Sequence, residues 1–82
     1  MNGTIDAILE YLDSSVGPKN AADVFLEISP KTKDKMRAVT IALDFLASFD
    51  IIIKRGDKYW IHPFTHDFLR ELKQAGESDE TT

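Results

Sequence analysis

The spacing of apolar side chains changes abruptly near residue 50, and this change limits the folds open to the chain more than any other feature. From residue 36 to residue 49, apolar residues recur every three or four positions, as on one face of a helix. Two apolar runs follow, over residues 51–54 and 58–62, in which apolar residues recur at every second position, as on a strand face. The tight-turn residues Gly56 and Asp57 lie between these runs. The segment therefore predicts a long helix that leads directly into a β-hairpin.

Two shorter helices are predicted before this segment. The first covers residues 5–15, where apolar residues form a one-sided helical stripe. Gly17-Pro18 interrupts the pattern, and Asn20 then offers a side-chain cap for a second helix over residues 21–28. Ser29-Pro30 is expected to separate this helix from the next, because proline disfavours helix in the preceding residue and suits a first turn. We therefore expect the long helix to begin between residues 30 and 34.

A fourth helix is predicted to begin at Pro63 and to pack back on the core. Its core-facing residues would be Phe64, Phe68, Leu69 and Leu72. We expect one domain over residues 1–74 and a flexible, acidic tail over residues 75–82. The predicted fold is α+β and mainly α, in the order helix, helix, helix, strand, strand, helix.

The composition excludes several classes of function. The chain has no cysteine, which excludes disulfides, thiolate catalysis and cysteine-based metal sites. No apolar run approaches the roughly 18 residues of a membrane span, and we expect a cytoplasmic protein without a membrane partner. His62 and His66 are four residues apart, but no third ligand joins them, so we predict no metal site. No catalytic set or phosphate-binding glycine loop is present, and we predict no enzyme activity, no catalytic residue and no cofactor.

The charge of the chain is unevenly distributed. The net charge is −4, which by itself disfavours nucleic-acid binding. Residues 31–58, however, hold seven Lys or Arg against four Asp or Glu, a local charge of +3. The remainder holds three against ten, a charge of −7. Positive charge is therefore concentrated on the predicted long helix and hairpin.

Residues 42–61, with the sequence ALDFLASFDIIIKRGDKYWI, resemble the winged helix-turn-helix superfamily, in particular its small prokaryotic transcription regulators. They match that family's order of helix end, apolar strand, basic turn with glycine and aromatic return strand, although the family usually places glycine where Phe49 or Asp50 stands. The resemblance extends over about residues 4–74. It implies a third helix that enters the DNA major groove and a hairpin, the wing, that contacts the adjacent backbone or minor groove. It also implies double-stranded DNA as partner and transcription regulation as role.

Carried onto this sequence, the resemblance nominates seven nucleic-acid-binding residues. The groove candidates are Lys31, Lys33, Arg37 and Thr40, and the wing candidates are Lys54, Arg55 and Lys58. Helical spacing independently places Lys33, Arg37, Thr40 and Asp44 on one stripe of the long helix, away from its core-facing residues. The alternative interpretation is that these residues are ordinary charges on a solvated helix.

Four further residues are predicted as interface candidates: Tyr11, Ile41, Trp60 and Phe64. Ile41 lies off the core stripe of the long helix, and Trp60 is either an aromatic that covers the sheet or a contact to a partner. We expect a homodimer, since the first and fourth helices are the usual dimer elements of the superfamily. The alternative function is a winged helix used as a protein-interaction module without DNA binding, which the net charge favours.

Overall fold

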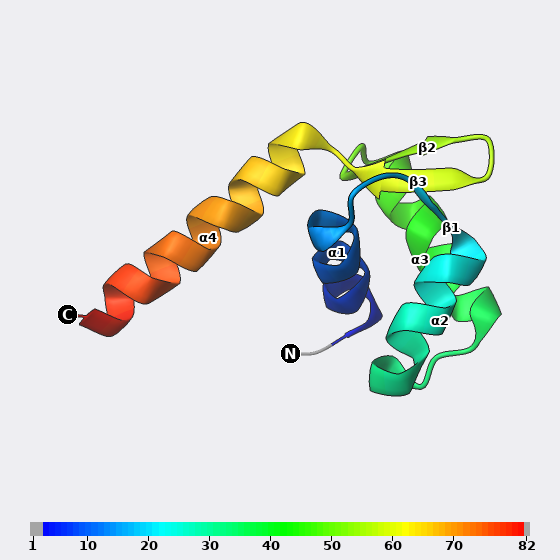
Figure 1. The fold of residues 1–82 in the computed structure, drawn as a ribbon, viewed down its shortest axis with the longest axis horizontal. Coiled ribbons are helices and arrows are strands. Elements are labelled where there is room, and N and C mark those ends of the chain that lie inside the picture. Colours follow the sequence, from blue (N-terminus) through cyan, green and yellow to red (C-terminus); the bar gives the residue numbers. More distant parts are fainter. Residues whose placement is uncertain (1–2, 82) are drawn as a thin grey trace.

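The computed structural model describes the backbone of residues 3–81 and the side chains of residues 3–75 (Figure 1). The fold is α+β and mainly helical, with four described helices and a three-stranded antiparallel sheet. In chain order the elements are α1 (Thr4–Ser14), β1 (Lys19–Asn20), α2 (Ala21–Thr32), α3 (Met36–Ser48), β2 (Ile52–Arg55), β3 (Lys58–Ile61) and α4 (Pro63–Thr81). The prediction of an α+β, mainly helical fold is confirmed, whereas the predicted order of elements is incomplete, because a strand lies between the first two helices.

The sheet has the strand order β1-β3-β2, with both pairs antiparallel. The predicted hairpin is confirmed: Arg55 of β2 lies opposite Lys58 of β3, and Gly56 in the turn has a positive φ of 61°. The strand β1 was not predicted, because two residues are too few to show an alternating pattern. It pairs with β3 by placing Lys19 opposite Tyr59, and it leads directly into α2.

The boundary between α2 and α3 differs from the prediction. Pro30 lies inside α2, which continues to Thr32, and α3 begins only at Met36. The chain closes the end of α2 with Lys33 in the left-handed conformation (φ 60°), whose N–H donates to the Ser29 carbonyl at 2.7 Å. The helix therefore ends at this left-handed residue and not at the proline.

Local hydrogen bonds also cap the start of α2 and the end of α3. The predicted cap of α2 is confirmed, since Asn20 Oδ1 accepts from the Asp23 N–H at 2.8 Å. At the end of α3, Asp50 takes the left-handed conformation (φ 58°), and the Ile51 N–H donates to the Leu46 carbonyl at 3.1 Å. Aspartate is one of the few residues besides glycine that tolerates this conformation. The sharp exit from α3 into β2 is thus made without the glycine that is usual at such a position.

The core lies where α1, α2 and α3 meet one face of the sheet. Its fully buried residues come from all three helices and both hairpin strands: Ile8, Leu12, Val24, Ile28, Val39, Leu43, Leu46, Ile52 and Tyr59. α3 contributes three of them, one on each successive turn, so it is the central helix of the fold.

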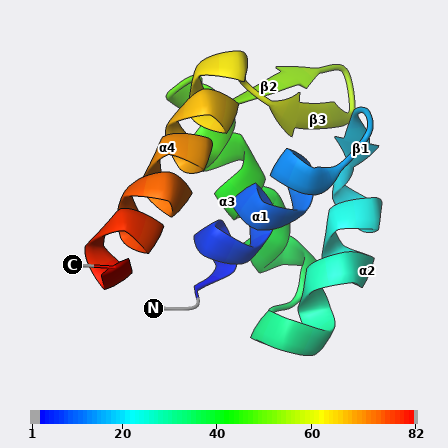
Figure 2. The ribbon, with the colours of Figure 1, turned by 60° about the vertical axis from the view of Figure 1, so that its left-hand side comes forward.

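α4 does not pack on the core as predicted. Phe64, Phe68 and Leu72 remain 81%, 58% and 51% exposed, and Figures 1 and 2 show the helix leaving the sheet as an arm beside α1. The segment predicted as a tail, residues 75–82, is helical as far as Thr81, because one glycine weakens a helix by only about 1 kcal/mol. Among residues 3–81, no helix combines the length and apolar character needed to cross a membrane.

Candidate nucleic-acid interface

The predicted groove-facing residues are divided among three parts of the structure. Lys31 lies in the last turn of α2, and Lys33 is the left-handed residue at which α2 ends. Arg37 and Thr40 lie on α3. The prediction of a single helical stripe from Lys33 to Asp44 is therefore wrong at its first residue. The error follows from a predicted helix start that is too early.

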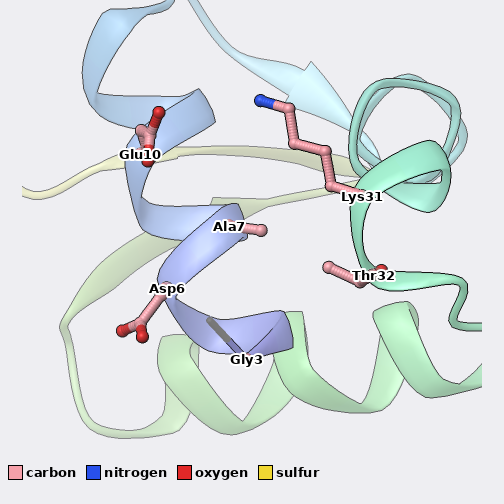
Figure 3. Close-up of a pocket in the computed structure, with 6 residues that line it drawn as sticks. All are labelled: Gly3, Asp6, Ala7, Glu10, Lys31 and Thr32. Atoms are coloured by element: carbon pink, nitrogen blue, oxygen red, sulfur yellow. The ribbon is translucent and has the colours of Figure 1, made fainter. Parts of the chain in front are cut away.

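Lys31 borders a surface cavity of about 290 Å³ between α1 and the end of α2 (Figure 3). The other residues that line this cavity are Gly3, Asp6, Ala7, Glu10 and Thr32. In Figure 3 the Lys31 side chain extends toward the turn of α1 that carries Glu10. Because carboxylates repel phosphate, Asp6 and Glu10 make this position unfavourable for a DNA contact.

The exposed surface of α3 has a polar side and an apolar side. The polar side carries Arg37, Thr40 and Asp44 at steps of three and four residues. The apolar side carries large residues with half or more of their surface exposed: Ile41 (59%), Phe45 (50%) and Phe49 (64%). Only the polar side offers the charged and hydrogen-bonding groups that contact phosphates and most base edges.

A hydrogen-bond network joins the polar side of α3 to the β2–β3 hairpin. Asp44 Oδ1 accepts from Lys54 Nζ at 3.0 Å and from the Tyr59 hydroxyl at 2.9 Å. The Lys54 ammonium also lies 5.6 Å from the centroid of the Tyr59 ring. Lys54, a predicted wing contact, is therefore already paired with a carboxylate, although it lies next to the Arg55–Lys58 pair at the tip of the hairpin.

The network also shifts the pKa values of its three members. The hydrogen bond from Lys54, followed by the one from Tyr59, holds the pKa of Asp44 below its usual range. The hydrogen bond to Asp44 raises the pKa of Lys54, and burial raises the pKa of Tyr59. At neutral pH the carboxylate is thus charged and both partners keep the protons that they donate.

Replacing Asp44 with Ala is expected to lower the free energy of unfolding at pH 7 by roughly 1–2 kcal/mol, because the Tyr59 hydroxyl loses its acceptor. The folded-state pKa of Asp44 is lowered, so its contribution is present above the ordinary Asp range near pH 4 and is lost as the pH falls through the folded-state pKa. Urea unfolding of both proteins at neutral pH and at about pH 2.5 measures the effect. The stabilities should differ at pH 7 and approach each other in acid, and equal stabilities at pH 7 would contradict the network.

The tip of the hairpin presents two exposed cations. Arg55 and Lys58 are cross-strand neighbours that flank the Gly56-Asp57 turn. The Arg55 guanidinium lies 5.9 Å from the centroid of the half-buried Trp60 ring. This cation–π contact restricts the guanidinium without neutralising its charge. Both cations therefore remain available to a phosphate.

The four predicted interface candidates differ in exposure. Ile41 and Phe64 are 59% and 81% exposed, whereas Tyr11 and Trp60 are half-buried, and Tyr11 packs against the core. Several exposed apolar residues were missed as interface candidates, because their helical spacing is also typical of core residues. These are Phe45, Phe49, Phe68 and Leu72.

His62 and His66 bind groups within the chain. His62 Nδ1 accepts from the Phe64 N–H at 3.1 Å. His66 Nδ1 lies 2.5 Å from Asp13 Oδ1, and its Nε2 lies 3.3 Å from Arg70 Nη2. Because arginine only donates, Nε2 is the acceptor and Nδ1 donates to the carboxylate. In the part of the chain that the structure describes, no three His, Cys, Asp or Glu residues are grouped as metal ligands.

Arg37, at the start of α3, and the two cations at the hairpin tip thus lie on elements that the Asp44 network connects. Their chemistry suits an anionic partner. No protein-family model, curated protein or solved structure matches this chain.

Proposed function

We propose that the chain is a winged helix that binds double-stranded DNA, with the polar side of α3 in the major groove and the β2–β3 hairpin as the wing. The observation that carries this proposal is the network in which Asp44 binds Lys54 and Tyr59, because it fixes the hairpin to the side of α3 that carries Arg37. A helix of this kind fits the width of the major groove. The cations of helix and hairpin would then approach one duplex together.

Arg37 is the residue best suited to reading bases. It is exposed in the first turn of α3, and a guanidinium can donate two hydrogen bonds to the edge of guanine. Lys33 and Lys35 are exposed just before this turn and can neutralise phosphates beside it. The carboxylate between them, Asp34, is half-buried and accepts a hydrogen bond from the Thr4 hydroxyl of α1. This end of α3 is therefore the part that we place in the groove.

The wing would position the protein on the backbone and carry little sequence information. Arg55 and Lys58 can each contact a phosphate, which together with the cations near the start of α3 gives roughly three to five contacts per chain. Binding by so few contacts is weak at physiological salt. A homodimer on two half-sites would bind more tightly, and we propose transcription regulation as its role.

A protein-interaction module is the second candidate function. The net charge of −4 and the apolar side of α3, with Ile41, Phe45 and Phe49 exposed, favour it. Salt separates the two functions, because phosphate binding weakens steeply as salt rises and apolar docking does not.

The variants Arg37→Ala and Arg55→Ala are expected to weaken DNA binding in different ways. Arg37→Ala should cost about 1–3 kcal/mol on the preferred duplex and relax the base preference at one position. Arg55→Ala should weaken binding to all duplexes evenly and reduce the salt slope by about 1. Binding-site selection from a random duplex pool, followed by titration of the selected duplex, measures both effects.

Arg70→Ala is the matched control, because it removes the same charge from α4, away from α3 and the hairpin. It should bind DNA like the wild type. If all three variants bound equally well, the proposed interface would be wrong.

A further inference from the structure

α4 carries an apolar stripe that the described part of the chain leaves exposed. Phe64, Phe68 and Leu72 recur every four residues and expose 81%, 58% and 51% of their surface. Side-chain contacts from Thr65 and His66, both near the start of this 19-residue helix, hold it to the rest of the fold. The stripe therefore lies on an arm that is anchored at one end (Figure 1).

The stripe forms one wall of an apolar groove. A cavity of about 360 Å³ lies between α1, the residue before β2 and α4. In Figure 2, α4 runs beside α1, so the cavity has a helix on either side. We name this region the α1–α4 groove and define it by the apolar lining of the cavity and one further residue of the stripe: Leu9, Ile51, Phe64, Phe68, Leu69 and Leu72. The stripe is roughly 12 Å long, so a partner helix of about three turns would cover it.

Carboxylates border the groove along its outer edge on α4. Asp67 and Glu71 follow Phe64 and Phe68 by three residues, and residues three apart are neighbours on a helix surface. Both carboxylates are exposed. Leu69 lies on the other flank of the stripe, where it lines the cavity toward α1. The edge of the groove that is far from α1 is therefore acidic.

The edge along α1 is acidic as well. A second cavity, of about 180 Å³, adjoins the groove, because Leu9 and Leu69 line both cavities. Its other lining residues are three carboxylates of α1 and one cation of α4: Asp6, Glu10, Asp13 and Lys73. The second cation within residues 63–75 is Arg70, whose Nη2 lies 3.3 Å from Nε2 of His66 and thus near the Asp13 carboxylate that His66 contacts. Carboxylates therefore dominate both edges of the groove.

We propose that the α1–α4 groove binds an amphipathic helix of another protein, one whose apolar stripe is flanked by Lys or Arg. Helices of this kind dock in hydrophobic grooves through apolar residues at steps of three and four. Their apolar anchors would cover Phe64, Phe68 and Leu72, and their flanking cations would approach the carboxylates on both edges. The proposal goes beyond DNA binding, since none of the cations proposed to contact DNA lines the groove or the adjoining cavity.

Charge distinguishes this partner from two other occupants. DNA is disfavoured, because the carboxylates on both edges repel phosphate. A second copy of the chain is disfavoured as well. In a twofold pair the same patch faces itself, so a dimer would bring the acidic edges of two grooves together. The homodimer proposed on DNA would then use another surface.

Fluorescence anisotropy of a labelled synthetic peptide tests the proposal with the full chain. The probe is an amphipathic peptide of about 14 residues, with leucines at steps of three and four and lysines on both flanks, because a helix of this length covers the groove. The reference peptide has the same leucines and carries glutamate in place of every lysine. We expect the lysine peptide to bind at micromolar concentration in physiological salt, and the glutamate peptide to bind at least about tenfold more weakly.

Two pairs of variants locate the binding site. Phe68→Ser removes an apolar anchor of the stripe without changing the charge, and Leu26→Ser makes the matched change at a residue that is 69% exposed on α2. Glu71→Lys reverses a charge at the edge of the groove, and Glu27→Lys makes the same reversal at an exposed position of α2. Phe68→Ser should weaken binding of the lysine peptide at least about tenfold, and Glu71→Lys about fivefold. Both α2 variants should bind like the wild type.

Circular dichroism and sedimentation velocity of the same proteins complete the test. Phe68 and Glu71 are exposed in a single chain, so their variants should keep the helix content of the wild type. The proposal would be overturned by equal binding of the two peptides, by equal losses in the α4 and α2 variants, or by no binding to the wild type. A wild-type chain that dimerises without peptide, together with a monomeric Phe68→Ser, would show that a second copy covers the groove and would also overturn it. DNA is absent from these measurements, so the proposed function is tested separately.

Discussion

Replacing Leu43 with Ala is expected to lower the free energy of unfolding by about 3 kcal/mol. Leu43 is fully buried at the middle of α3, the helix that contributes most to the core. Its truncation removes apolar contacts and leaves a cavity that neighbours on three elements cannot fill without moving. A domain of this size has a total stability of roughly 5–10 kcal/mol, so the loss is a large part of the total. The melting temperature should fall by about 12–24 °C.

Thermal and urea unfolding of the two proteins measure this effect. Leu26→Ala is the control, because Leu26 is 69% exposed on α2, and it should change stability by no more than about 0.5 kcal/mol. If Leu43→Ala cost less than about 1 kcal/mol, α3 would not be the central helix, since buried leucines cost more than this.

The second large expected effect is the dependence of DNA binding on salt concentration. The association constant for a duplex of random sequence is expected to fall roughly 40- to 500-fold as salt rises from about 50 to 200 mM. Each neutralised phosphate contributes a logarithmic slope of about −0.9, and the exposed cations near the start of α3 and at the hairpin tip supply roughly three to five contacts per chain. Lys54 is omitted from this count because it is paired with Asp44.

Anisotropy titrations at several salt concentrations give the slope directly. Titrations in a neutral crowding agent, at the same viscosity as the salt solutions, control for changes in anisotropy that do not come from ions. An affinity that changes less than about threefold over this range would correspond to fewer than one phosphate contact, and it would favour the protein-interaction function.

Local features of the fold were predictable from the sequence because they depend on neighbouring residues. The change of apolar spacing at Asp50 located the exit from α3, and the Gly56-Asp57 pair located the turn of the hairpin. Asn20 was identified as a cap because the bond that it makes reaches only three residues along the chain. Each of these signals lies within a few residues of the structure that it specifies.

Features that depend on distant contacts were not predictable. Pro30 suggested a helix boundary, but α2 continues to Thr32 and ends at Lys33, which takes a left-handed conformation that lysine rarely adopts. The bond between Asp44 and Tyr59 joins residues that are 15 positions apart, and spacing alone gave no sign of it. α4 has the apolar pattern of a core helix, but this pattern does not show whether the apolar face packs against the same chain or against another molecule.

The same distinction applies to the candidate interface. Exposure of Arg37, Arg55 and Lys58 followed from their positions on a predicted helix and turn. The pairing of Lys54 and the position of Lys31 beside the carboxylates of α1 required the three-dimensional arrangement. The set of cations that we propose to contact DNA is therefore smaller than the sequence suggested.

Fluorescence anisotropy of a labelled random duplex tests DNA binding most directly. The duplex is titrated with the wild type and with the double variant Arg37→Ala/Arg55→Ala, at low and at physiological salt. We predict binding by the wild type that weakens steeply with salt, loss of binding in the double variant, and wild-type behaviour in Arg70→Ala. No binding by the wild type even at low salt would contradict DNA as the ligand and would direct attention to protein partners of the apolar side of α3.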